Sequence, residues 1–274
     1  MTDPLARIAA ALERIAPPPP PAADPAAHLA YLWHGSVLEA ARGFAPLPLD
    51  LLTGMDAQKA ALVENLRRLA AGYAAHDVLL WGARGTGKSA LAASTAAASG
   101  VALVEVATAS LDSLPRLFAV LAPVGRAFAV FVDDLGFATP GEARALRSLL
   151  EGGAEARPAN VRLIVTSNRR HLVPRDLAEN DPINPRDAAD DALALADRFG
   201  LSLGFHAIDQ ETYLAIVARY AVAHGLGFDP ADAIGWATRR GSRSGRVAWQ
   251  YVVDLAGRAG VTLARGEAVD LDQS

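Results

Sequence analysis

The sequence has no cysteine and only two methionines among its 274 residues. Without cysteine there are no disulfide bonds and no thiolate ligands for a metal, and the composition fits a reducing compartment. The six histidines do not recur at the spacings that bind zinc, so we expect no zinc site.

The sequence also lacks a secretory signal and a membrane-spanning run. The chain begins with Met-Thr-Asp-Pro, and no basic stretch leads into an apolar one. The longest uncharged stretch, residues 89–104, is rich in Ala and Ser and is interrupted by Gly100. It predicts a helix followed by a strand rather than a membrane span. We therefore expect a cytoplasmic protein without a membrane partner.

The charge balance is weakly acidic, with a formal net charge of −4. Such a balance gives no global attraction to nucleic acid, although it does not exclude a local basic patch. Arg169, Arg170 and Arg175 form one local basic group, which could meet either nucleic-acid phosphates or a neighbouring subunit. We favour the neighbouring subunit.

Residues 1–46 are predicted to form a helical, Pro-rich extension. Apolar residues recur at helical spacing from Leu5 to Ile15, and the prolines of 17–21 end that helix. A second helical segment is predicted over 25–42, followed by a Pro-rich loop over 44–49. This region is better suited to covering the main domain or a neighbouring subunit than to catalysis.

Beyond the extension, helices alternate with short apolar runs. A helix is predicted from Met55 to Ala71, and the pattern is helical again after Asp209. Between them lie five apolar runs: Val78–Trp81, Val101–Val106, Ala127–Val132, Val161–Thr166 and Leu201–Phe205. Continuous apolar runs that alternate with helices predict an α/β domain with a parallel sheet buried on both faces.

The first apolar run leads directly into a phosphate-binding loop. Its residues are Gly82, Ala83, Arg84, Gly85, Thr86, Gly87, Lys88 and Ser89, which match G-x-x-x-x-G-K-[ST] at every fixed position. Glycines let successive main-chain N–H groups point at phosphate oxygens, and the following helix presents its positive end to them. Lys88 is expected to reach the β- and γ-phosphates of ATP, and the Ser89 hydroxyl to bind Mg²⁺. The variable Arg84 is expected to be solvated.

An acidic pair, Asp133 and Asp134, follows the third apolar run. The carboxyl ends of parallel strands are where such sheets bind ligands. We expect Asp133 to hold Mg²⁺ through water and Asp134 to orient or deprotonate the attacking water. Alternatively, one Asp caps the next helix and the other is merely solvated.

The fourth apolar run ends in the polar residues Thr166-Ser167-Asn168. Because the adjacent strand should place Asn168 beside Asp133, we expect Asn168 to bind the γ-phosphate or to hold the lytic water. The alternative is an Asn that forms a turn.

The phosphate loop, the acidic strand end and the polar strand end, in this order, resemble the AAA+ P-loop ATPases. The resemblance implies a five-stranded parallel sheet of order 5-1-4-3-2, followed by a C-terminal helical lid. We therefore divide the chain into the extension over 1–46, a nucleotide-binding α/β domain over 47–207 and a lid over 208–274.

Two arginines acquire roles through this resemblance. The string Asp197-Arg198-Phe199-Gly200 is similar to the arginine-finger box, which makes Arg198 the group that reaches into a neighbour's ATP site in a ring or filament. Arg246, before a helical run, is similar to the lid arginine that touches the γ-phosphate, with Arg243 as second choice. Each could instead be a solvated surface charge.

The resemblance also implies that adenine lies between the sheet domain and the lid. Apolar contact is all that the base requires there. The implied residues are Leu52, Thr53 and Gly54 on one side, and Ile208 and Ile216 on the other.

A closer resemblance is to a bacterial AAA+ family catalogued only as domain of unknown function 815. It covers roughly residues 47–260 and implies ATP binding without a known cellular task. The strings that carry it are Leu149-Leu150-Glu151-Gly152-Gly153, Ser167-Asn168-Arg169-Arg170-His171-Leu172, Asp197-Arg198-Phe199-Gly200 and Gly245-Arg246-Val247-Ala248.

The acidic strand end departs from the AAA+ pattern, because most AAA+ enzymes carry Asp-Glu where this chain has Asp133-Asp134. Asp is one methylene shorter than Glu, which indicates slow or partner-stimulated hydrolysis. The leading hypothesis is an AAA+ ATPase that remodels, loads or regulates an unknown protein partner. The alternatives are a nucleotide-dependent switch with little turnover and a DNA-associated loader; a small-molecule kinase would leave the lid and Asn168 without a role.

Overall fold

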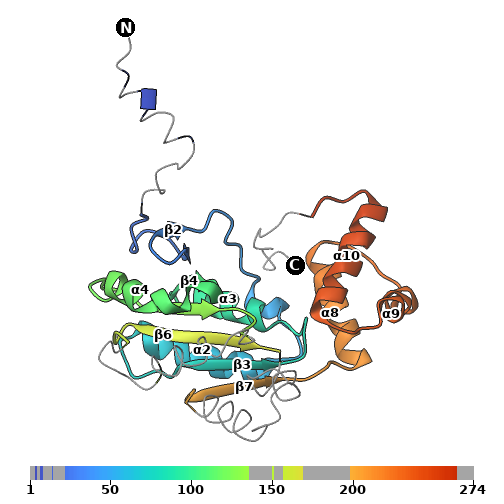
Figure 1. The fold of residues 1–274 in the computed structure, drawn as a ribbon. Coiled ribbons are helices and arrows are strands. Elements are labelled where there is room, and N and C mark those ends of the chain that lie inside the picture. Colours follow the sequence, from blue (N-terminus) through green and yellow to red (C-terminus); the bar gives the residue numbers. More distant parts are fainter. Residues whose placement is uncertain are drawn as a thin grey trace, which may run out of the picture.

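The computed structural model describes residues 22–135, 157–168 and 198–263, together with the isolated residues Pro4, Arg7, Ile8, Arg14 and Leu150. Within these residues the chain forms one sheet, with strand order β2-β1-β4-β5-β6-β3-β7 (Figure 1). The strands are β1 (Ala30–Trp33), β2 (Leu38–Ala40), β3 (Val78–Gly82), β4 (Ala102–Val106), β5 (Phe128–Val132), β6 (Val161–Ser167) and β7 (Leu201–Phe205). Among the strand pairs that the structure describes, only β1–β2 is antiparallel.

The five predicted apolar runs form β3 to β7, and their order agrees with the expected 5-1-4-3-2. The predicted count of five strands was wrong, because β1 and β2 extend the sheet beyond β4 to seven strands. The prediction of a helix over 25–42 was also wrong. β1 pairs in parallel with β4 from Ala30 to Trp33, so a contact distant in sequence overrides the local helical pattern.

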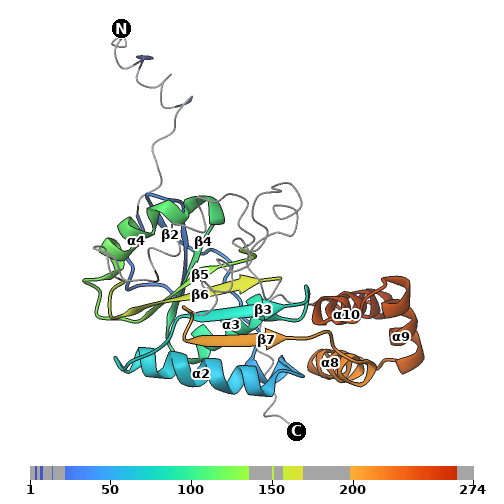
Figure 2. The ribbon, with the colours of Figure 1, turned by 60° about the horizontal axis from the view of Figure 1, so that its bottom comes forward.

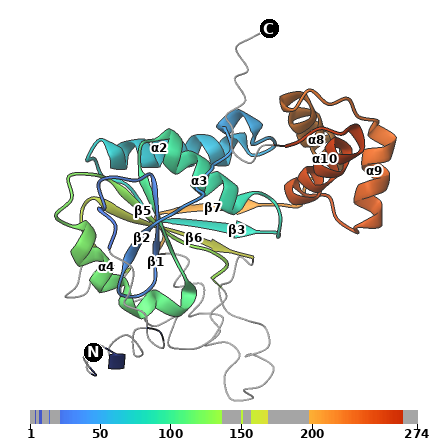
Figure 3. The same cartoon turned by 90° about the horizontal axis from the view of Figure 1, so that it is seen from above.

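The sheet is covered on both faces, as its continuous apolar strands require. One face packs against α2 (Asp56–Ala70) and α3 (Lys88–Ala98), and the other against the 3-10 segment η2 (Thr108–Ser113) and α4 (Leu114–Leu121) (Figure 3). Side chains alternate between the faces: Leu79 belongs to the cluster beside α4, whereas Val78 and Leu80 belong to the cluster beside α2 and α3.

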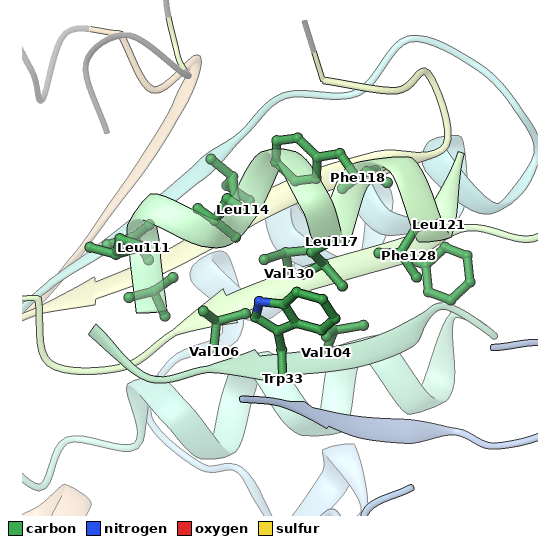
Figure 4. Close-up of a cluster of buried hydrophobic side chains, with 14 of the residues drawn as sticks. Trp33, Val104, Val106, Leu111, Leu114, Leu117, Phe118, Leu121, Phe128 and Val130 are labelled. Atoms are coloured by element: carbon green, nitrogen blue, oxygen red, sulfur yellow. The ribbon is translucent and has the colours of Figure 1, made fainter. Parts of the chain in front are cut away.

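Trp33 anchors the added strand β1 to the core on the α4 side. Its side chain lies among residues of β4, β5 and α4, including Val104, Val130 and Leu117 (Figure 4). The indole N–H donates to Ser113 Oγ at 2.7 Å, so its one polar group is paired. The predicted extension thus contributes to the main sheet, and the predicted helix near residues 5–15 lies largely outside the described residues.

A helical unit follows β7, at the end of the sheet toward which β3 and β7 point (Figure 2). Its helices are α8 (Gln210–Ala223), α9 (Pro230–Arg239) and α10 (Gly245–Ala259), which share a hydrophobic cluster that also includes Leu51. Each helix begins at a capping side chain: Asp209, Asp229 and Ser244 accept from N–H groups in the first turn. None of the described helices has both the length and the apolar character needed to cross a membrane.

Candidate functional site

A cavity of about 590 Å³ opens between the sheet and the helical unit. It has a polar end, formed by the β3–α3 loop and the residues that follow β5 and β6. Its apolar end is formed by residues 47–55, which include the 3-10 turn η1 (Leu49–Leu51), and by α8 and α10. Such a cavity at the carboxyl edge of parallel strands is where α/β proteins bind ligands.

The β3–α3 loop is the segment predicted to bind phosphate. Gly82 has φ +133°, and a Cβ there would lie 1.9 Å from the Phe205 carbonyl oxygen of the adjacent strand. Gly87, at φ +94°, precedes the first residue of α3. These two positions require glycine for steric reasons. The cavity-lining part of the loop runs from Arg84 to Ser89, so Gly82 and Ala83 lie behind it.

Lys88 is buried at the start of α3 and is held by the loop itself. Its Nζ donates to the carbonyl oxygens of Gly82 and Ala83, both at 2.8 Å. Burial lowers the pKa of the Lys88 ammonium, and the nearby carboxylates of Asp133 and Asp134 partly oppose that shift. A buried cation thus faces the polar end of the cavity.

Three oxygen-bearing side chains converge next to Lys88. Ser89 Oγ donates to Asp133 Oδ1 at 2.8 Å, and Thr166 Oγ1 donates to the same oxygen at 2.6 Å. One carboxylate with hydroxyl oxygens fits Mg²⁺, which is bound through few protein ligands, several waters and the phosphates of its substrate. The predicted metal ligands Ser89 and Asp133 therefore lie together and have suitable chemistry.

Asp134 is held from three directions. Its N–H donates to Thr166 Oγ1 at 2.8 Å, Asn168 Nδ2 donates to its carboxylate, and the guanidinium of Arg84 lies 3.4 Å from Oδ2. Among the described residues, Asp134 is the sole non-glycine residue with positive φ, at +49°. Arg84 is largely exposed, as predicted, but the prediction did not include its ion pair with Asp134.

The helical unit reaches the loop through the start of α10. The Arg246 N–H donates to the Gly85 carbonyl at 3.5 Å, and the Arg246 side chain lines the cavity. The second-choice Arg243 is not among the lining residues that the structure describes. Leu52, Thr53, Gly54, Ile208 and Ile216 all line the cavity, and their predicted contact with adenine stays a prediction.

Arg198 lies away from this cavity. It precedes β7, whose first residue Leu201 pairs with Val78 at the start of β3. Arg198 thus lies near the amino-terminal ends of β3 and β7, whereas the phosphate loop lies at the carboxyl end of β3. It is not among the described lining residues of its own chain's cavity. Its predicted action on a neighbour stays a prediction. The basic group Arg169, Arg170 and Arg175, and the segment 171–196, lie outside the described residues.

Sequence reasoning missed several residues at the site. Thr166 connects Asp133 with the backbone of Asp134, and its position in a polar strand end was the available signal. Met55 places its methyl group 2.8 Å from where a Gly87 Cβ would lie. Tyr220 and Trp249 line the apolar end, and no sequence motif marked them.

The family model described as "Protein of unknown function (DUF815)" matches residues 26–259. The chain belongs to this family. The match begins just before β1 and ends at the last residue of α10, so it covers the sheet and the helical unit together. No curated protein matches this DUF815 sequence.

Solved structures with a similar fold include the Thermotoga maritima RuvB Holliday junction branch migration motor. It is 20% identical with a TM-score of 0.56, and the match covers 80% of this chain and 68% of the RuvB chain. The Aeropyrum pernix ORC2 protein, solved as ADPNP-ADP complexes, is 16% identical with a TM-score of 0.55, covering 82% of this chain and 68% of that one. The DUF815 protein therefore has the α/β fold of AAA+ proteins.

Proposed function

We propose that this DUF815 protein binds Mg·ATP and hydrolyses it to ADP and phosphate, and that it uses the cycle to act on a protein partner. The observation that carries the proposal is the convergence of Lys88, Ser89 and Asp133 at one end of a cavity of about 590 Å³. This group combines a buried cation with hard oxygen ligands beside a phosphate loop.

Each element of the polar end has a part in this reaction. The N–H groups of the loop and Lys88 bind the β- and γ-phosphates. Lys88 then donates its hydrogen bonds to phosphate oxygens instead of to the carbonyl oxygens of the loop. Ser89 and Asp133 hold Mg²⁺, which neutralises phosphate charge when it is bound. Arg246 adds a second cation from α10, which lines the same cavity.

Asp134 and Asn168 would position the attacking water. Its oxygen forms a bond to the γ-phosphorus as the bond from that phosphorus to the bridging oxygen breaks, and a proton passes to the Asp134 carboxylate. Because phosphoryl transfer depends on positioning and charge neutralisation, the hydrogen bond from Asn168 to Asp134 supports this role.

Calorimetry with Mg·ATP tests the proposal directly. Wild-type protein should bind with a measurable heat, and Lys88→Met should lose that binding because a methionine side chain has no charge. Phosphate release should fall in parallel. Wild-type protein without heat, or an unaltered Lys88→Met variant, would remove the proposed site.

A second candidate function is a nucleotide-dependent switch with little turnover. The restraint on Asp134 favours it: Asn168 and Arg84 both bind its carboxylate, and Asp is one methylene shorter than the Glu usual at this position. Phosphate release far slower than nucleotide dissociation would support the switch. Arg84→Ala should then raise basal release by at most about fivefold, since an exposed ion pair contributes about 1 kcal/mol or less.

A DNA-associated function is less supported. The Thermotoga maritima RuvB protein is a Holliday junction branch migration motor, but its likeness to this chain is one of fold. The net charge of −4 gives no overall attraction to a polyanion. A salt-dependent shift of duplex or junction DNA by the purified protein would reverse this preference.

A further inference from the structure

Two aromatic side chains meet at the apolar end of the cavity. Tyr220 of α8 and Trp249 of α10 both line it, and their ring centroids are 5.4 Å apart with an interplanar angle of 77°. Tyr220 is 6% exposed and belongs to the hydrophobic cluster of the helical unit. It therefore holds the Trp249 ring at an edge-to-face angle.

Trp249 is packed on one side and open on another. The ring centroids of His224 and Trp249 are 5.7 Å apart, so Tyr220 of α8 and His224, the residue after α8, both contact the Trp249 ring. The tryptophan itself is only partly buried, and it lines the cavity. Trp249 thus contributes an aromatic ring to the cavity lining, and two neighbouring rings support its orientation.

The position of Trp249 along α10 links it to the polar end. It follows Arg246 by three residues, so the two side chains are neighbours on the helix surface. Both line the same cavity. α10 therefore presents a cation and an aromatic ring to one ligand space, which suits a ligand that joins an anion to a flat ring.

Trp236 is the other tryptophan of the helical unit, and it does not line the cavity. It is also partly buried against the helical cluster, but it lies under the Arg240 guanidinium, 4.5 Å from the ring centroid. Among the four tryptophans, all of which the structure describes, Trp249 alone lines the cavity. Packing of the helical unit explains Trp236, but it does not require Trp249 to face the cavity.

We propose that Trp249 is the stacking platform for the nucleotide base, with Tyr220 as the positioning residue behind it. The proposal rests on the nucleotide site proposed above and adds the group that binds the base. Because every base has a π-face, this contact favours an aromatic base without discriminating adenine from guanine. The apolar contacts of Ile216 and Leu52 then complete the enclosure of the ring.

Binding measurements on Trp249→Ala test the platform. Calorimetry with Mg·ADP, Mg·GDP and inorganic tripolyphosphate separates the base from the phosphates. Trp249→Ala should weaken both diphosphates by about 5- to 150-fold, the range of base–aromatic stacking, and leave tripolyphosphate within about twofold. Trp249→Phe should retain most of the affinity, and Trp236→Phe, the matched control, should retain all of it.

Intrinsic fluorescence provides a second measurement that does not depend on the alanine variant folding. Mg·ADP should change the tryptophan emission of wild-type protein and of Trp236→Phe, whereas Trp249→Phe should lose the change. Equal ADP affinity in wild-type protein and Trp249→Ala would overturn the platform alone. Equal losses for ADP and tripolyphosphate would also overturn it. Wild-type protein that binds neither ligand would overturn the nucleotide site itself.

Discussion

Asn168 donates a hydrogen bond from its side-chain amide to the carboxylate of Asp134. The amide oxygen of the same side chain accepts from Lys88 Nζ at 3.4 Å. One side chain at the end of β6 thus connects the lysine of the phosphate loop with the carboxylate proposed to orient water. This connection makes the geometry of Asp134 dependent on β6 as well as on its own strand.

Asn168→Ala should reduce hydrolysis while leaving ADP binding within about threefold. Misplacement of a catalytic group by about 1 Å can cost about 10²-fold in rate, so we expect a fall in kcat of that order with little change in KM. Asn168→Asp should be at least as damaging, because a second carboxylate would repel Asp134. Normal kcat in both variants would remove Asn168 from the reaction.

The lowered pKa of Lys88 predicts how binding depends on pH. Only the protonated lysine attracts phosphate, so affinity for ADP should begin to fall at a pH below the ordinary lysine value of about 10.4. Bound phosphate favours the ammonium, and binding in that range should therefore take up protons. Calorimetry in two buffers of different ionisation enthalpy measures this uptake.

The lowered pKa of Lys88 has the opposite pH effect on the stability of the nucleotide-free protein. The folded pKa of Lys88 lies below its unfolded one, so the unfolded state binds more protons between the two values and the free energy of unfolding rises with pH there. Lys88→Met should lack both effects, and Lys88→Arg, which stays charged, should lack the proton uptake. Identical pH profiles in wild-type protein and Lys88→Met would contradict this account.

Arg198 should matter only when subunits assemble. Because it lies at the end of the sheet away from the phosphate loop, it would have to act on a neighbour's nucleotide. Specific activity of wild-type protein should then rise with protein concentration, since an arginine finger contributes about 10³- to 10⁵-fold in rate. Arg198→Ala should bind ADP normally and lose the rise. A concentration-dependent rise that persists in Arg198→Ala would exclude the finger role.

Trp33→Ala tests whether β1 belongs to the core. The side chain is 2% exposed and its indole N–H is paired with Ser113, so removing it should lower the free energy of unfolding by about 3–5 kcal/mol. Urea denaturation measures the loss. Tyr73→Ala, at a side chain that is 70% exposed, is the control and should change stability by less than about 0.5 kcal/mol. An equally small effect at Trp33 would mean that β1 is not part of the folded core.

Local sequence determined much of this fold. Five continuous apolar runs identified β3 to β7, since strands buried on both faces need apolar residues throughout. The spacing of glycines, lysine and serine after β3 identified the phosphate loop, because main-chain curvature there excludes other residues. The segment over 30–40 was misassigned, because its apolar pattern did not distinguish an added strand from a helix before β4 was available as a partner.

Only the tertiary structure decided which side chains meet. Asp133 and Asp134 could have been a helix cap and a solvated charge, but Ser89, Thr166 and Asn168 reach them from two other elements. Trp249 belongs to no motif, and it lines the cavity beside Tyr220, which comes from a different helix. The sequence determined the chemistry of the loop through local backbone requirements. The arrangement around that loop depends on contacts between segments far apart in the chain, which no local pattern encodes.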